Sequence, residues 1–158
     1  MVMRIDGDAA WSDFVQYHLM RSPSDEQAKC EFHLQWTVGG HRMREQLNDD
    51  EALLGMLRNW LPSYIGPALT LFRGENVDRW RCKHIGMCWT AARDTAEMFA
   101  RGLNAVHSGG VLLQCDVIPT AIITGPSSHS LYLGEAEYTV DPRLLENVKI
   151  VQRYPAVS

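Results

Sequence analysis

Apolar residues in the first 65 positions recur at helical spacing. From Ala9 to Met20 they fall three or four positions apart, which predicts an amphipathic helix. Ser24 is the expected N-cap of a second helix, because a short polar side chain here precedes acidic residues. The segment 28–38 has two interpretations, since Phe32, Leu34, Trp36 and Val38 alternate and would also suit a strand.

A third helix is expected after Gly39-Gly40, a pair that interrupts the preceding pattern. Asn48-Asp49-Asp50-Glu51 supplies polar and acidic residues for its first turn, and leucines then follow on one side. Pro62 marks its end, because proline cannot continue a helix. The first part of the chain, 1–66, is therefore predicted to be mainly helical.

The second part, 67–158, has short apolar runs separated by turn residues. Strands are predicted at 68–72, 111–118, 135–140 and 148–151, with a further apolar run at 121–123 and one amphipathic helix at 90–103. Helices followed mostly by strands indicate an α+β fold rather than a doubly wound sheet. We expect a single domain over 1–158.

Composition narrows the class of protein. The 158 residues are 46% hydrophobic and 22% charged, with a net charge of −4, as in ordinary soluble domains. The acidic balance argues against broad binding to nucleic acid or anionic membrane. No apolar run reaches the ~18 residues of a membrane span, and the first residues lack a secretory signal core, so a cytoplasmic protein is expected.

The four cysteines, Cys30, Cys82, Cys88 and Cys115, are irregularly spaced, which favours reduced thiols over disulfides. Cys82, His84 and Cys88 could supply three metal ligands, but no fourth ligand follows at a typical spacing. We therefore expect no metal.

Glu135 and Glu137 are the most informative pair of residues. In a strand they would point to the same face, roughly 6–7 Å apart. Two like charges side by side oppose folding unless they are used, although a solvated edge strand is the common explanation for such a pair. Two upstream segments, Leu71-Phe72-Arg73-Gly74 and Cys88-Trp89-Thr90, favour a functional interpretation.

These segments, in this order, resemble the mono-ADP-ribosyltransferases of the arginine-serine-glutamate type. In that family an arginine ends a core strand, a Ser-x-Ser/Thr strand leads into a helix with an Ala-x-x-Phe-Ala pattern, and Glu/Gln-x-Glu starts a late strand. Here the helix pattern is Ala96-Glu97-Met98-Phe99-Ala100, and Tyr138-Thr139-Val140-Asp141-Pro142 follows the glutamates. The resemblance covers about Leu69 to Val151. It implies a split β-sandwich core with NAD, as co-substrate, in a cleft.

The resemblance also implies roles for individual residues. Arg73 would bind the NAD pyrophosphate, which suits a guanidinium, and Gly74 would let the backbone approach it. Glu137 would stabilise the ribosyl cation formed when nicotinamide leaves. Glu135 would act as general base toward the acceptor. Thr90 would hydrogen-bond Glu137 and fix its rotamer.

Cys88 departs from the family pattern, because it stands where the first serine is expected. We interpret it as a tolerated change within the cofactor pocket. Trp89 is also in this motif, and packing is favoured over a contact with nicotinamide. The loop 125–134 precedes the glutamates; His129 and Tyr132 in it either contact the acceptor or belong to an ordinary surface loop.

These observations predict a toxin-like or effector-like enzyme of bacterial or phage type that transfers ADP-ribose from NAD to a macromolecule. A protein acceptor, with arginine as one option, is favoured over nucleic acid, and no membrane partner is expected. An immunity or inhibitor protein, and delivery into a target-cell cytosol, stay open. Two alternatives remain: an NAD glycohydrolase, and a catalytically silent binding module on the same fold.

Overall fold

The computed structural model describes residues 5–127, 130–131 and 134–157. The chain forms two compact units. One contains the residues up to Ser63 together with Ser127, and the other contains Tyr64–Pro126 and the residues from Ser130 onward. The change from one unit to the other at 63/64 lies close to position 66, where the sequence pattern changes from helical to strand-like.

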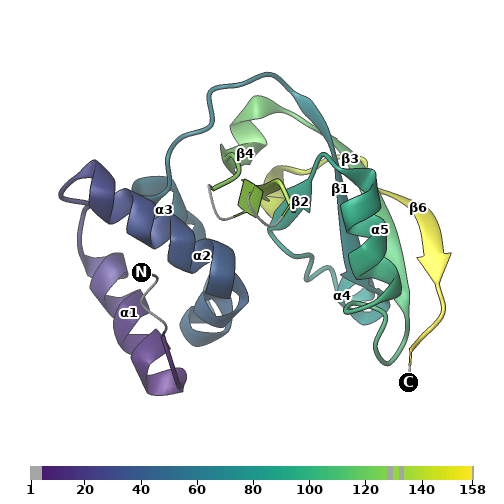
Figure 1. Cartoon of the computed structure of the whole chain (residues 1–158), viewed down its shortest axis with the longest axis horizontal. Helices are drawn as coiled ribbons and strands as arrows, with labels where there is room; N and C mark the ends of the chain where they lie inside the picture. The colour runs from purple at the N-terminus through teal and green to yellow at the C-terminus, as the bar shows by residue number, and fades with distance from the viewer. Residues whose placement is uncertain (1–4, 128–129, 132–133, 158) are drawn as a thin grey trace. The chain divides into compact units, whose positions relative to one another are not determined.

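The first unit consists of the helices α1 (Asp8–Met20), α2 (Glu26–Leu47) and α3 (Asp50–Trp60) (Figure 1). The segment 28–38 is helical, which settles the choice between helix and strand, because Phe32 and Trp36 fall on one buried helix face. The N-cap of α2 is Asp25 rather than Ser24. The Asp25 carboxylate accepts a hydrogen bond of 2.7 Å from the backbone N–H of Ala28.

The glycine pair that interrupts the pattern lies inside α2 rather than after it. Gly39 has non-helical dihedrals (φ −135°, ψ 26°), so α2 is kinked there. A Cβ on Gly39 would collide with the ring of Trp11, and one on Gly40 would press on the ring of Trp36. The two glycines thus let bulky aromatic side chains approach the helix backbone closely.

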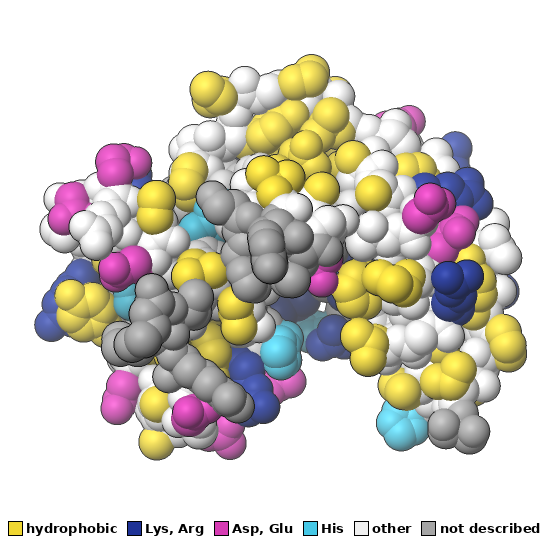
Figure 2. All heavy atoms as spheres, viewed as in Figure 1, with side chains coloured by type: hydrophobic (Ala, Val, Ile, Leu, Met, Phe, Trp, Pro, Cys, Tyr) yellow, Lys and Arg dark blue, Asp and Glu magenta, His cyan; other side chains and the backbone are white. Residues whose placement is uncertain are grey.

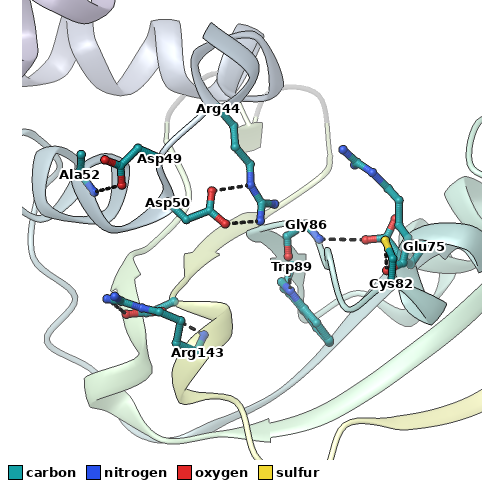
Figure 3. Close-up of polar contacts among 11 residues, drawn as sticks. Arg44, Asp49, Asp50, Ala52, Glu75, Cys82, Gly86, Trp89 and Arg143 are labelled. Atoms are coloured by element: carbon teal, nitrogen blue, oxygen red, sulfur yellow. Dashed lines mark hydrogen bonds and ion pairs between the residues drawn. The ribbon is translucent and has the colours of Figure 1, made fainter. Parts of the chain in front are cut away.

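Helix α3 begins where the acidic residues predicted a helix start. The Asp49 side chain accepts a hydrogen bond from the N–H of Ala52 at 3.1 Å, which caps the helix. Arg44 at the end of α2 holds Asp50 through two hydrogen bonds of 3.0 and 2.8 Å (Figure 3). The apolar side of α3 is buried, through Leu53, Leu54, Met56, Leu57 and Trp60.

The second unit is built on a six-stranded sheet. Its strands are β1 (Leu69–Asn76), β2 (Cys88–Thr90), β3 (Gly110–Val117), β4 (Ile122–Thr124), β5 (Glu137–Val140) and β6 (Lys149–Tyr154). They lie in the order β4-β5-β2-β1-β3-β6, and all neighbours are antiparallel. Together with the helices this confirms the α+β class.

Pairing across this sheet is uneven. Strands β1 and β3 pair along their whole length, from Leu69↔Val117 to Asn76↔Gly110. Strands β1 and β2 share one registered pair, Phe72↔Thr90. The two halves of the sheet, β4-β5-β2 and β1-β3-β6, are therefore joined by a narrow seam, the single pair Phe72↔Thr90. Arg73, the next residue on β1, lies beside this seam.

Helix α5 (Arg93–Arg101) packs on β1 (Figure 1). It is shorter than the predicted helix at 90–103, because Thr90 belongs to β2, and Leu103, with 76% of its surface exposed, is not part of the packed face. Ala96 and Ala100 are the buried residues of α5. The short helix α4 (Val77–Arg81), which follows β1, was not expected.

The core of this unit lies on the β1 face that carries Leu71 and the β2 face that carries Trp89. Partly buried side chains, among them Tyr64 and Tyr138, pack against the edge of this core. The core residues are Leu71, Val77, Trp89, Val111, Leu113, Cys115, Val117, Ala121, Ile122 and Val140.

None of the described helices has the length and apolar character needed to cross a membrane.

Candidate active site

The three motifs of the sequence lie on three adjacent strands. Arg73 is on β1, Cys88-Trp89-Thr90 is the whole of β2, and Glu137 is the first residue of β5. Thr90 pairs with Phe72 on one side and with Glu137 on the other. Segments more than 60 residues apart in the sequence are thus brought to one place in the sheet.

Glu137 is the carboxyl group at the centre of this arrangement. It lies directly across from Thr90, so the two side chains share a face with Cβ atoms about 5 Å apart. Burial raises the pKa of Glu137 to about 7, and the charge of Glu135 acts in the same direction. A hydrogen bond from Cys88 and the charge of Arg73 oppose this rise. Near neutral pH Glu137 therefore exchanges between protonated and ionised forms.

Cys88 supports Glu137 directly. Residues two apart in a strand share a face, so Cys88 lies on the Thr90 and Glu137 face, where its thiol hydrogen-bonds the Glu137 carboxylate. Burial, followed by the charge of Glu137, holds the pKa of Cys88 well above its usual range. The thiol is therefore protonated at neutral pH and serves as a donor rather than a nucleophile.

Thr90 does not have the hydrogen bond that the resemblance implies. Its hydroxyl oxygen accepts the backbone N–H of Ala92 at 3.0 Å, at the turn between β2 and α5. The side chain that bonds Glu137 is Cys88. The physical reason is the chain reversal after Thr90, which brings the Ala92 N–H within reach of the Thr90 hydroxyl.

Glu135 is not part of the strand, which corrects the predicted strand at 135–140. Ala136 adopts a left-handed conformation (φ 44°), and β5 begins only at Glu137. The two glutamates are therefore not related by strand alternation, although the charge of Glu135 still acts on Glu137.

Ser130 holds the turn that carries both glutamates, and sequence reasoning missed it. Its backbone carbonyl accepts the N–H of Glu135 at 3.0 Å, and its Oγ accepts the N–H of Glu137 at 2.7 Å. Ser130 is fully buried. Serine in a polar loop is too common for its spacing to have indicated this role.

Arg73 reaches across the seam between β1 and β2. Its Nε donates to Glu75 at 2.7 Å, and its Nη1 donates to the backbone carbonyl of Cys88 at 2.8 Å. A guanidinium has five N–H donors, so two are used and three remain. The side chain is 15% exposed, so the guanidinium is largely enclosed by the protein and keeps some contact with solvent.

Glu75 is the second residue that sequence reasoning missed. It is fully buried, and burial alone would raise the pKa of its carboxyl group. The charge and hydrogen bond of Arg73, with backbone N–H donors, outweigh burial and hold this pKa below its usual range. The signal was present in the sequence, since Arg73 and Glu75 are two apart in a strand and have opposite charges.

Gly74 was predicted to let the backbone approach the cofactor, and Trp89 was predicted to pack rather than to contact nicotinamide; both have packing roles in this structure. A Cβ on Gly74 would collide with the backbone of Ala96 and Ala100, so this glycine lets α5 approach β1 closely. Trp89 is 1% exposed and belongs to the core, in agreement with the packing interpretation. Its indole N–H donates to the carbonyl of Gly86 at 3.1 Å (Figure 3).

His129 and Tyr132 lie outside the described residues. All four cysteines are free, as expected. Within residues 5–127, 130–131 and 134–157, no cluster of three or more His, Cys, Asp or Glu side chains could hold a metal ion.

The site thus combines a protonatable carboxyl group, a buried thiol donor and a guanidinium with free donors. This set can bind an anion and stabilise a positive charge that develops beside Glu137. No protein family, curated protein or solved structure matches this chain in the comparisons.

Proposed function

We propose that this protein cleaves NAD and transfers its ADP-ribose group to a macromolecular acceptor. On this proposal the two sheet halves joined at the β1–β2 seam correspond to a split β-sandwich of the ADP-ribosyltransferase type. Arg73 binds the pyrophosphate, and Glu137 lies beside the ribose that carries nicotinamide.

The register Phe72↔Thr90↔Glu137 is the observation that carries this proposal. It places a guanidinium with free donors and a carboxyl group of pKa about 7 on strands separated by β2 alone. A dinucleotide has a pyrophosphate at one side of a ribose and the reacting carbon at the other. On this proposal the pyrophosphate binds Arg73 and the reacting ribose lies beside Glu137.

The chemical step breaks the bond between C1′ of the ribose and the nicotinamide nitrogen. The bonding electrons leave with nicotinamide, which departs as a neutral molecule, and positive charge develops on the ribose. Ionised Glu137 stabilises this charge and accepts a hydrogen bond from the 2′-hydroxyl. A lone pair of the acceptor then forms the new bond to C1′, and Glu135 takes the acceptor's proton.

A protein is the favoured acceptor class. The net charge is −4, and on the face in Figure 2 acidic and basic side chains are interspersed around α5 and β6. The ion pair Arg93–Glu97 on α5, at 2.9 Å, is an example of this mixing. A nucleic acid acceptor would be better served by a continuous basic surface. An arginine side chain suits the paired negative charges of Glu135 and Glu137.

The test is incubation of the protein with labelled NAD and a cell lysate. Wild type is expected to label a discrete protein band, and Glu137→Gln is expected to lose the labelling. Glu146→Gln, which removes a carboxylate in the loop before β6, is the matched control and is expected to label normally. Free ADP-ribose without a labelled band would instead assign the site to NAD hydrolysis. No consumption of NAD by the folded protein would refute both reactions and favour a binding module.

A further inference from the structure

The carboxylate of Glu75 is the hub of a buried hydrogen-bond cluster. Its Oε2 accepts the Nε–H of Arg73 at 2.7 Å and the backbone N–H of Gly86 at 2.9 Å. Its Oε1 accepts the backbone N–H of Asn76 at 2.9 Å. Because Glu75 is fully buried and has three donors, it has one favoured rotamer.

Gly86 forms the second side of this cluster (Figure 3). A Cβ at this position would collide with the guanidinium of Arg73, so the missing side chain leaves the space that Arg73 fills. The Gly86 carbonyl accepts the indole N–H of Trp89, which anchors it to the core. The guanidinium is thus held by the Glu75 carboxylate, the Gly86 backbone and the carbonyl of Cys88.

This arrangement decides which part of Arg73 stays free. The Nε–H and one hydrogen of Nη1 are used inside the protein. One hydrogen of Nη1 and both hydrogens of Nη2 remain; one Nη2 hydrogen lies on the same edge as Nε–H, and the other faces the Nη1 end of the planar group. Free N–H groups of a guanidinium suit the oxygens of a phosphate group.

We infer that Glu75 and Gly86 are positioning residues that hold the guanidinium of Arg73 in the orientation required to bind the diphosphate of the dinucleotide. The inference rests on the proposed function. It adds that the affinity for NAD depends on two residues that do not touch it. Loss of either one leaves Arg73 present but wrongly oriented.

Two variants test this in different ways. Glu75→Gln keeps the size of the side chain but removes the charge-assisted bond to Arg73. Gly86→Ala leaves every charge in place and displaces the guanidinium through its Cβ, at a backbone conformation without positive φ. Each is expected to raise the KM for NAD about tenfold or more, with kcat changed by less than about threefold.

Matched controls separate this from general effects of mutation. Glu97→Gln removes the carboxylate of the surface pair with Arg93, and Gly55→Ala adds a Cβ that meets nothing within 4 Å. Both are expected to keep the wild-type KM. Thermal unfolding of all four variants, followed by circular dichroism, identifies any that fail to fold. If Glu75→Gln does not fold, Gly86→Ala still decides the question.

A second measurement needs no NAD. The ionisation of Glu137 is followed by carbon NMR of labelled glutamate, with Glu137→Gln to assign the signal. Arg73 lowers the pKa of Glu137, against the effects of burial and Glu135. Displacing Arg73 in Gly86→Ala is therefore expected to raise the titration midpoint above that of wild type.

The outcomes are distinguishable. A raised KM in the folded variants, with a raised Glu137 midpoint in Gly86→Ala, supports the inference. Folded variants that keep both the wild-type KM and the wild-type midpoint overturn it. Wild type that neither binds nor cleaves NAD refutes the proposed function and the dinucleotide as the target of Arg73. In that case a shifted midpoint would still show that Gly86 positions Arg73.

Discussion

The thiol of Cys88 hydrogen-bonds the carboxyl group of Glu137 across the β2–β5 pair. Cys88, which stands where the resemblance expects a serine, is thus the side chain that hydrogen-bonds Glu137, whereas the Thr90 hydroxyl accepts the N–H of Ala92. Burial raises the pKa of Glu137 and the contact with Cys88 lowers it, so together they influence how much of Glu137 is in the ionised form that the proposed reaction requires.

Substitution of Cys88 is expected to change the pKa of Glu137 in opposite directions. Cys88→Ser offers a stronger donor to the ionised carboxylate and should lower this pKa below about 7, whereas Cys88→Ala removes the donor and should raise it. Carbon NMR titration of labelled glutamate measures both. Cys82→Ser, at an exposed cysteine, is the control. Equal midpoints in the two Cys88 variants would contradict the contact.

The pH dependence of NAD cleavage is expected to follow Glu137. The ionised form stabilises the ribosyl cation, so kcat/KM should rise with pH, level off above about 7, and fall tenfold per pH unit below it. Nicotinamide release between pH 5 and 9 measures this profile. In Cys88→Ser the midpoint should move to lower pH. A rate independent of pH from 5.5 to 8.5 would exclude Glu137 as the essential ionised group.

The ionisation of Glu137 should also affect the stability of the fold, in the opposite direction: it favours the proposed reaction but lowers the free energy of unfolding. The pKa of Glu137 is about 7 in the folded protein against 4.5 in the unfolded chain, so the folded state binds the proton more tightly. The stabilisation is fully present below pH 4.5 and is lost as pH rises through 7. This loss amounts to at most about 3.5 kcal/mol, for a rise of about 2.5 units at ~1.4 kcal/mol per pKa unit.

Urea unfolding at pH 5 and pH 8 measures this effect. Glu137→Gln has no carboxyl group to ionise, so it should lose less stability than wild type between the two pH values. The difference in unfolding free energy between the variant and wild type should therefore shift in favour of the variant between pH 5 and pH 8. Parallel losses in the two proteins would mean that Glu137 titrates normally in the folded state.

Gly74→Ala is expected to destabilise the second unit. The added Cβ would collide with the backbone of Ala96 and Ala100, and backbone cannot move aside as a flexible side chain can. Overpacking of this kind costs about 1–3 kcal/mol in the free energy of unfolding. Gly55→Ala is the control, because its Cβ meets no neighbour in α3 and should be neutral or stabilising. A neutral Gly74→Ala would place α5 farther from β1.

Much of the local structure could be predicted from the sequence. Three N-terminal helices, the strands around Leu71 and Val111 and the α+β class follow from apolar spacing, because a helix or strand must bury one face whatever its neighbours are. The ambiguous segment 28–38 could not be assigned locally. Its aromatic residues suit either period, and burial of Phe32 and Trp36 within the helical unit decided for a helix.

The candidate site depended on the tertiary structure. The sequence by itself determined that Arg73, Thr90, Glu135 and Glu137 are present in a suggestive order, but order along a chain says nothing about strand adjacency. Strand pairing across long sequence separations placed β2 between β1 and β5. The partners of each group also followed from packing. Thr90 is hydrogen-bonded to Ala92, Glu137 to Cys88, and Arg73 to Glu75. These partners could not be predicted from the sequence, because a buried polar group bonds the nearest available partner in space.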